Sequence, residues 1–232
     1  MATMALILAT AASIDSWLLD ATSTLPPSSI SSESLGYIFF KNPVLVLGLV
    51  LGHLAAGDIN LQNAAALSVT FLFITVPVML FAATIGKKIP DGFNMVCYAL
   101  FSAAMLVPAY FVCKSFSATI FDSAGIYPSL LAVSTVPIVY SSKIAEKQSP
   151  EKAALSGICI TLGFALTAFV LGGAREILSS GSLWGYKLTG IAYPAAKLPF
   201  WGFIFLGFMA AIVNWIKEIS KKSAEKSEEE SA

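Results

Sequence analysis

The sequence predicts an all-α integral membrane protein with six transmembrane helices, arranged as two inverted three-helix repeats. The first helix of each repeat is expected to be short or broken. Of the 232 residues, 56% are hydrophobic and 12% are charged, about half the charged fraction of an average soluble domain. Long uncharged windows recur along the chain, and the lysines collect at alternate ends of them.

The uncharged windows locate the spans, because crossing the hydrocarbon layer takes about 20 mostly apolar residues. The first window is short and contains His53. The fourth contains Pro128 and Pro137, which disfavour a continuous helix, so we expect it to be interrupted. The other four windows are predicted to be full-length helices. In chain order the windows cover residues 42–57, 59–86, 92–113, 123–142, 153–174 and 198–216.

Charge placement predicts the orientation, because loops on the cytoplasmic side are enriched in lysine and arginine. With the N-terminus inside, ten of the 14 basic residues fall on the inner side. The prediction is therefore that both termini are cytoplasmic. The inner residues are Lys41, Lys87, Lys88, Lys143, Lys147, Lys152, Lys217, Lys221, Lys222 and Lys226; the outer ones are Lys114, Arg175, Lys187 and Lys197.

Three regions follow from the windows. Residues 1–36 read as a short interfacial helix and a Ser- and Pro-rich linker, with a cleaved signal peptide as the alternative. Residues 37–218 form the six-helix membrane domain. Residues 219–232 are a charged cytoplasmic tail, expected to extend the last helix and then fray.

The order short–long–long occurs twice, and three spans per unit turn the second unit upside down. Pro43 and Pro128 open the two short windows, and the string AALS occurs at residues 65–68 and again at 153–156. In so apolar a chain, chance also produces such a match. In an inverted repeat, two broken helices meet near the midplane, where unwound backbone supplies polar groups for transport or cofactor sites.

Several strings resemble a known family. The run LGFALTAFVLGGAREILSSGSLWG at residues 162–185 resembles the fifth helix and following loop of the E subunit of Rnf complexes and the D subunit of Nqr complexes. Shorter matches are KNPVLV at residues 41–46, Asn63-Ala64, SAGI at 123–126 and PFWGF at 199–203.

The resemblance implies a role in electron transfer between ferredoxin or NADH and NAD or quinone, coupled to movement of Na⁺ or H⁺. It also implies an inverted homologous partner in the same membrane. In the family, each broken helix contributes one cysteine, and four cysteines from the two homologues hold a [2Fe–2S] cluster in the membrane.

This sequence departs from the family at both cysteine positions, which fall on Gly52 and Thr135. Glycine has no ligating side chain, and threonine is not a usual cluster ligand. We therefore expect no cofactor bound by this chain. His53 follows the first position, where the family usually has proline, and Ser134 precedes the second.

The residues at the breaks each allow two interpretations. His53 is a candidate iron ligand or proton carrier, because an ionisable group in a span favours function; the alternative is a hydrogen-bonded core histidine. Ser134 and Thr135 are candidates for an ion path, and the alternative is a hydroxyl bonded to a carbonyl one turn back. Asp58 is expected to be a solvated helix cap.

Arg175 and Glu176 are adjacent on one helix and cannot face each other. Each is therefore expected to meet another segment or a partner protein. The cysteines, Cys97, Cys113 and Cys159, form no CxxC pair, so the sequence indicates neither a disulfide framework nor a zinc site.

The expected function is that of a membrane subunit in an Rnf/Nqr-type ion-translocating electron-transport complex of a prokaryotic inner membrane. Its partners would be the inverted homologue, other subunits, lipid and Na⁺ or H⁺, and not nucleic acid. Such a chain would not hold a complete active site. The alternative is a redox-inactive small transporter or a structural paralogue with the same fold.

Overall fold

The computed structural model describes residues 50–230 apart from residues 91–92, 117, 144 and 189–191. The expected interfacial helix and linker, and the first half of the first uncharged window, lie outside the described residues. Within the described part the chain is almost entirely helical, with one two-stranded hairpin.

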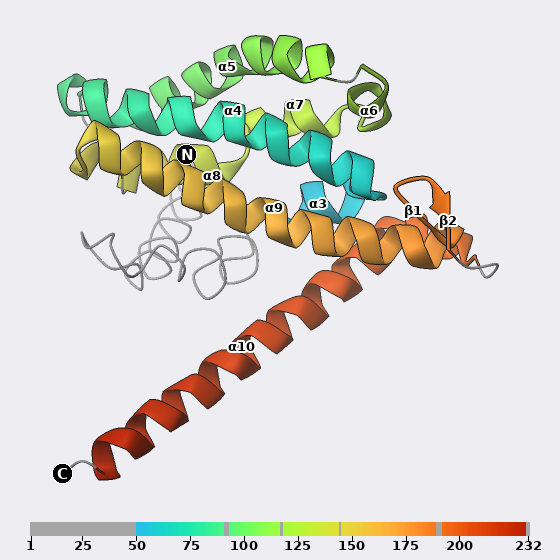
Figure 1. Cartoon of the computed structure of the whole chain (residues 1–232). Coiled ribbons are helices and arrows are strands. Elements are labelled where there is room, and N and C mark those ends of the chain that lie inside the picture. The colour runs from blue at the N-terminus through green and yellow to red at the C-terminus, as the bar shows by residue number, and fades with distance from the viewer. Residues whose placement is uncertain (1–49, 91–92, 117, 144, 189–191, 231–232) are drawn as a thin grey trace, which may run out of the picture.

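Four long helices dominate the fold (Figure 1). They are α4 (Leu61–Ile85), α5 (Asn94–Phe116), α9 (Pro150–Ser180) and α10 (Pro199–Glu230). Of the helices described, these four are long and apolar enough to cross a bilayer. They coincide with the four windows that the sequence predicts to be full-length. Pro77 and Pro108 lie inside α4 and α5 without ending them.

The fourth window is interrupted, as predicted. It forms α7 (Tyr127–Ala132) and α8 (Thr135–Lys143), with Val133 and Ser134 between them. The prolines do not mark the break: Pro128 lies in the first turn of α7 and Pro137 in the first turn of α8. Proline suits these positions because the first amides of a helix have no intrahelical partner. The end of α7 is capped from α5, where the Ser102 hydroxyl donates to the carbonyl of Ala132.

The core lies between α4 and α9, which pack along their length (Figure 1). Phe71 and Phe164 meet there with ring centroids 4.4 Å apart. Small residues allow the close approach: a Cβ added at Gly157 would lie 3.4 Å from the Val76 backbone. α4 also packs against α5 and is the more enclosed of the two helices, whereas α9 leaves part of its surface exposed.

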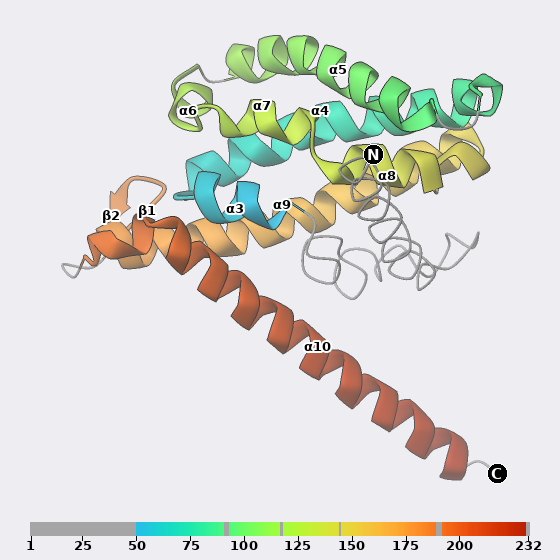
Figure 2. The same cartoon turned by 180° about the vertical axis from the view of Figure 1, so that it is seen from behind.

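The outer helices of the two halves pack crosswise. α5 contacts α4 of its own half and α8 of the other, whereas α10 contacts α3 (Leu51–Gly57) of the first half. Gly202 of α10 lies against α3, where an added Cβ would be 2.5 Å from the carbonyl oxygen of Ala55. Beyond this contact α10 diverges from the remaining helices (Figure 2).

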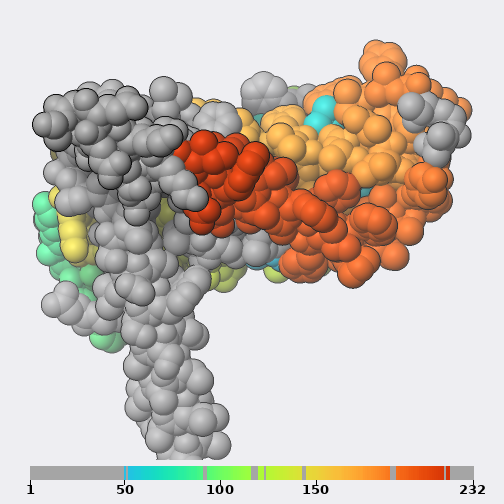
Figure 3. Space-filling view, turned by 90° about the horizontal axis from the view of Figure 1, so that it is seen from below, coloured from blue at the N-terminus to red at the C-terminus, as the bar shows by residue number. Residues whose placement is uncertain are grey.

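Most of α10 is uncovered. Phe203, Phe208, Ile212 and Trp215 are all more than half exposed. From below, α10 forms a ridge in front of the α9 surface (Figure 3). The helix continues to Glu230, through the residues that the sequence assigns to a charged tail.

Short elements connect the helices. They are α6 (Ala118–Ser123), the 3₁₀ turns η1 (Gly86–Lys88), η2 (Ala145–Lys147) and η3 (Pro194–Lys197), and the hairpin of β1 (Ser182–Leu183) and β2 (Tyr186–Lys187). The two residues of the hairpin turn, Trp184 and Gly185, have φ of 54° and 84°. Positive φ at both positions is the geometry that matches the twist of two antiparallel strands.

Candidate functional site

The first candidate region is formed by α3 and α7, which are in contact. An added Cβ at Gly57 would be 2.6 Å from the Tyr127 ring. Four residues earlier, His53 hydrogen-bonds the backbone of Leu130. The partly exposed histidine is therefore tied to the neighbouring half-helix, and its Nδ1 has no partner within the described part of the chain.

Gly52 and Thr135, the two positions that the resemblance assigns to the family's cysteines, are both exposed. Gly52 is exposed, and an added Cβ would meet no atom within 4 Å. Thr135, the first residue of α8, is also exposed, while Ser134 is buried and its hydroxyl has no partner among the described residues. The close approach of Gly52 and Thr135 that the sequence suggests stays a prediction.

The donors in this region do not fit the usual cluster. Gly52 offers no atom beyond its backbone and Thr135 offers a hydroxyl, whereas [2Fe–2S] iron takes thiolates or, in some centres, imidazoles. The cysteines lie on the spans. Cys113 of α5 contacts the Thr70 hydroxyl at 3.6 Å, and Cys97 and Cys159 lie within α5 and α9. The described residues hold no group of three His, Cys, Asp or Glu side chains placed to bind a metal ion.

The second candidate region is the end of α9, beside the hairpin of β1 and β2 (Figure 1). This end also contacts η3, and Arg175 joins it to the end of α3. Arg175, the one arginine of the chain, is fully buried there. A guanidinium has five N–H donors, and each one meets a backbone carbonyl. Nε donates to Ala196 (3.1 Å), Nη1 to Ala55 and Asp58 (both 2.8 Å), and Nη2 to Lys197 (2.8 Å) and Leu198 (3.2 Å).

Arg175 therefore joins three segments that are distant in sequence. It satisfies carbonyls at the end of α3 and carbonyls between η3 and α10. Three of the five bonds, to Ala55, Asp58 and Ala196, are buried. Without Arg175 these three carbonyls would be buried and unpaired, which in an apolar setting costs about 1–3 kcal/mol each.

Whereas Arg175 donates to backbone carbonyls, Glu176 accepts from backbone amides at the start of α4 and in the hairpin. One carboxylate oxygen accepts the Leu61 amide at 2.9 Å, and the other accepts the Gly185 amide at 3.1 Å and the Ser182 hydroxyl at 3.4 Å. A negative charge at a helix N-terminus is favourable because the first amides lack intrahelical partners. Glu176 thus fixes both α4 and the hairpin to α9. As expected from the sequence, the two adjacent side chains contact different segments.

Asp58 is buried, not solvated, so that expectation is wrong. It ends α3 as its C-cap, but the turn folds back under α9, and Gly172 leaves room for the carboxylate: a Cβ there would be 2.5 Å from Oδ1. Asp58 lies in the turn between the first and second predicted spans. Burial raises the pKa of its carboxyl well above the ordinary value, while the charge of Arg175 and the backbone of Gly172 oppose that shift.

The turn itself is held by two asparagines. Asn60 is the N-cap of α4 and accepts the Asn63 amide at 2.8 Å, and the Asn63 side chain donates to the Gly57 carbonyl at 2.9 Å.

A polar cavity of about 190 Å³ lies beside this turn, and Glu176, Ser179 and Lys197 form part of its lining. No sequence pattern indicates this cavity, because its walls come from separate segments.

A third polar cluster, also missed from the sequence, lies at the opposite end of α4. Glu146 of η2 accepts from the Asn94 amide group at 3.2 Å and from the Tyr98 hydroxyl at 3.3 Å. The close approach of Tyr98 to Gly86 places this cluster beside η1. In the sequence, the one indication of this cluster is the glutamate Glu146 in a lysine-rich loop. The contacts join the two halves at this end of the molecule.

Comparison with known proteins identifies the family. Residues 31–210 match the family model described as "Rnf-Nqr subunit, membrane protein". A Shewanella loihica protein, named as the E subunit of an ion-translocating oxidoreductase complex, is 29% identical over 192 residues, covering 76% of this chain and 83% of that protein.

Two further relatives carry more specific names. The E subunit of the Na⁺-translocating ferredoxin:NAD⁺ oxidoreductase complex of Acetobacterium woodii is 24% identical, over 77% of this chain and 92% of its own. The E subunit of the proton-translocating ferredoxin:NAD⁺ oxidoreductase complex of Clostridium ljungdahlii is also 24% identical, over 75% and 83%. The family model covers more than three quarters of the chain, and this chain therefore belongs to the Rnf-Nqr family of membrane subunits.

Proposed function

We propose that this chain is the E-type membrane subunit of an Rnf-type ion-translocating electron-transport complex. The observation that carries the proposal is the match to proteins named as the E subunit of such complexes, over most of both chains. The four apolar helices of the described part fit a membrane subunit. The complex would transfer electrons between ferredoxin or NADH and NAD or quinone and move Na⁺ or H⁺.

The proposed architecture is the inverted repeat. One unit is the first broken segment with α4 and α5, and the other is α7–α8 with α9 and α10. Its support is the crosswise packing: α5 contacts the broken helix of the second unit, and α10 contacts α3 of the first. We also propose a multi-pass protein of the cell inner membrane with both termini in the cytoplasm, and the lysine distribution supports this orientation.

The proposed partner is the inverted homologue, in contact with other subunits of the complex. Two features support an interface with this partner. Gly52 and Thr135 are both exposed, and α10 presents large apolar side chains that include Phe203, Phe208 and Trp215. His53, Ser134, Arg175 and Glu176 remain candidates for subunit contact or an ion path. The internal bonds of Arg175 and Glu176 favour a positioning role for these two residues.

The proposed cofactor role is that this chain supplies no ligand to a [2Fe–2S] cluster. The absence of thiolates at Gly52 and Thr135 supports it. The chain would then scaffold the complex rather than hold a complete active site. The same absence favours the second candidate function, a small transporter or structural paralogue without redox chemistry.

Affinity purification from native membranes separates the two functions. A tag after the last residue of this chain should recover an inverted homologue and the ferredoxin- or NADH-oxidising subunits in equal amounts. A tag on the homologue should recover this chain. Isolation of the chain alone, or as a homo-oligomer, would support the transporter.

A further inference from the structure

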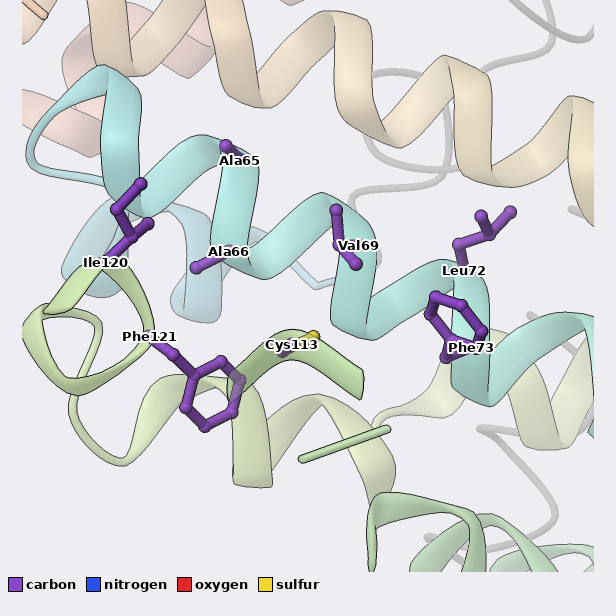
Figure 4. Close-up of a pocket in the computed structure, with 8 residues that line it drawn as sticks. All are labelled: Ala65, Ala66, Val69, Leu72, Phe73, Cys113, Ile120 and Phe121. Carbon is purple, nitrogen blue, oxygen red and sulfur yellow. The ribbon is translucent and has the colours of Figure 1, made fainter. Parts of the chain in front are cut away.

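A cavity of about 320 Å³ opens where α4, the end of α5 and α6 meet (Figure 4). We call it the α4–α6 groove. On α4 its walls include Ala66, Val69 and Phe73, and facing them are Cys113 of α5 and Ile120 and Phe121 of α6.

The side chains of the groove give water no free hydrogen-bonding partner. Its eight lining residues carry alkyl, aromatic or thiol side chains, and the Cys113 thiol is already in contact with the Thr70 hydroxyl. The volume equals that of roughly ten waters, but a water needs two to four polar partners, and apolar cavities of this kind stay dry. An empty groove would leave its walls without dispersion contacts.

The medium around the groove determines which kind of molecule can fill the groove. α4 and α5 are two of the helices suited to cross the bilayer, so the medium beside the groove is hydrocarbon. A flexible alkyl chain fits an elongated apolar groove between helices, whereas a polar metabolite would find no hydrogen-bonding partner along the walls.

The rim adds charges of both signs. Lys114 follows Cys113 at the end of α5 and is exposed. Its ammonium donates to the Tyr110 hydroxyl at 2.8 Å and lies 5.1 Å from the centre of that ring. Tyr110 in turn packs edge-on against Phe121 of the groove wall, with centroids 5.1 Å apart. Asp122, the residue after Phe121, is close enough to interact electrostatically with Lys114.

We propose that the α4–α6 groove binds one acyl chain of a phospholipid whose headgroup carries both a phosphate and an ammonium. The phosphate pairs with Lys114 and the ammonium with Asp122, while the alkyl chain lies between α4 and α6. The opposite charges at one end of a dry groove favour this zwitterionic headgroup over a purely anionic one. The proposal holds whether or not the complex transfers electrons.

The test uses the purified complex in nanodiscs that contain a trace of phosphatidylethanolamine with a diazirine in its acyl chain. After illumination, adducts are mapped by mass spectrometry. We expect adducts on the groove residues in excess of those elsewhere on α4 and α5. Val69→Trp should remove them by filling the groove. Leu100→Trp, at a position of α5 that is 68% exposed, is the matched control and should leave them unchanged.

A second variant tests the headgroup without altering the groove. Lys114→Gln should lower the yield of groove adducts about tenfold, as expected for loss of one charge-assisted bond. A probe with the same acyl chain on phosphatidylglycerol should label less than the phosphatidylethanolamine probe. Background-level labelling of the groove in the wild-type complex would overturn the proposal, because another subunit or residues 1–49 would then fill it. Equal labelling by both probes, unaffected by Lys114→Gln, would overturn the headgroup assignment.

Discussion

Replacing Arg175 by lysine keeps the positive charge and removes the planar fork of donors. The ammonium of lysine has three N–H groups, whereas five carbonyls face the guanidinium. At least two carbonyls must then lose their partner. We therefore expect Arg175→Lys to destabilise the fold although it is conservative in charge.

The magnitude follows from the number of lost bonds. Three of the five carbonyls, those of Ala55, Asp58 and Ala196, are in buried bonds. Loss of the donor to two of these three costs about 2–6 kcal/mol at 1–3 kcal/mol each. For a chain of this length, that loss lowers Tm by roughly 5–20 °C. Arg175→Gln should lose more, because it also removes the charge that faces Asp58.

The assay is thermal stability of the tagged protein in detergent, followed as the monodisperse fraction after heating. Lys187→Gln, at an exposed position of β2, is the control and should not change Tm. An Arg175→Lys protein as stable as wild type would refute the idea that all five bonds matter to the fold. It would leave Arg175 free for a role toward a partner.

Three other predictions can be checked with the same preparations. Gly202→Ala should destabilise by about 1–3 kcal/mol, because its Cβ would collide with the α3 backbone; Gly207→Ala, with open space around it, is the control, and equal Tm values for the two would contradict the packing. The raised pKa of Asp58 means that the folded state holds this proton more tightly than the unfolded state, so stability falls as pH rises above about 3.9. The difference in unfolding free energy between Asp58→Asn and wild type should therefore move in favour of the variant with rising pH, and the opposite slope would show that the Arg175 charge outweighs burial. The double variant Gly52→Cys and Thr135→Cys should add two irons and an electron paramagnetic signal to the complex if the backbone keeps the family's geometry. Replacing all three native cysteines by serine should leave the iron content unchanged. Loss of iron in that triple variant would show that this chain already ligates a cluster.

The long helices could be located from the sequence because hydrocarbon imposes length and composition on any span. The interruption of the fourth window could also be located, but for an incomplete reason. Prolines start α7 and α8, and the break lies between them at Val133 and Ser134. What makes the break tolerable is a serine on α5 that donates to Ala132, and a contact between distant helices leaves no local pattern.

The candidate site could also be predicted only in part from the sequence. Arg175 and Glu176 stand out in the sequence, since charges are rare in an apolar chain. Their partners do not, because backbone carbonyls and amides have the same chemistry at every residue. The expectation for Asp58 is wrong for a related reason. Its position at a helix end suggests contact with solvent, and only the packing of α9 over the turn buries it.

Coupled transport measures the central claim most directly. Membrane vesicles from cells that lack this chain should lose the Na⁺ or H⁺ uptake driven by electron transfer between ferredoxin or NADH and the acceptor. The wild-type chain should restore it, and Arg175→Lys should restore it only to the extent that the protein folds. Vesicles without the chain that keep full electron transfer and full ion uptake would contradict its assignment to the complex.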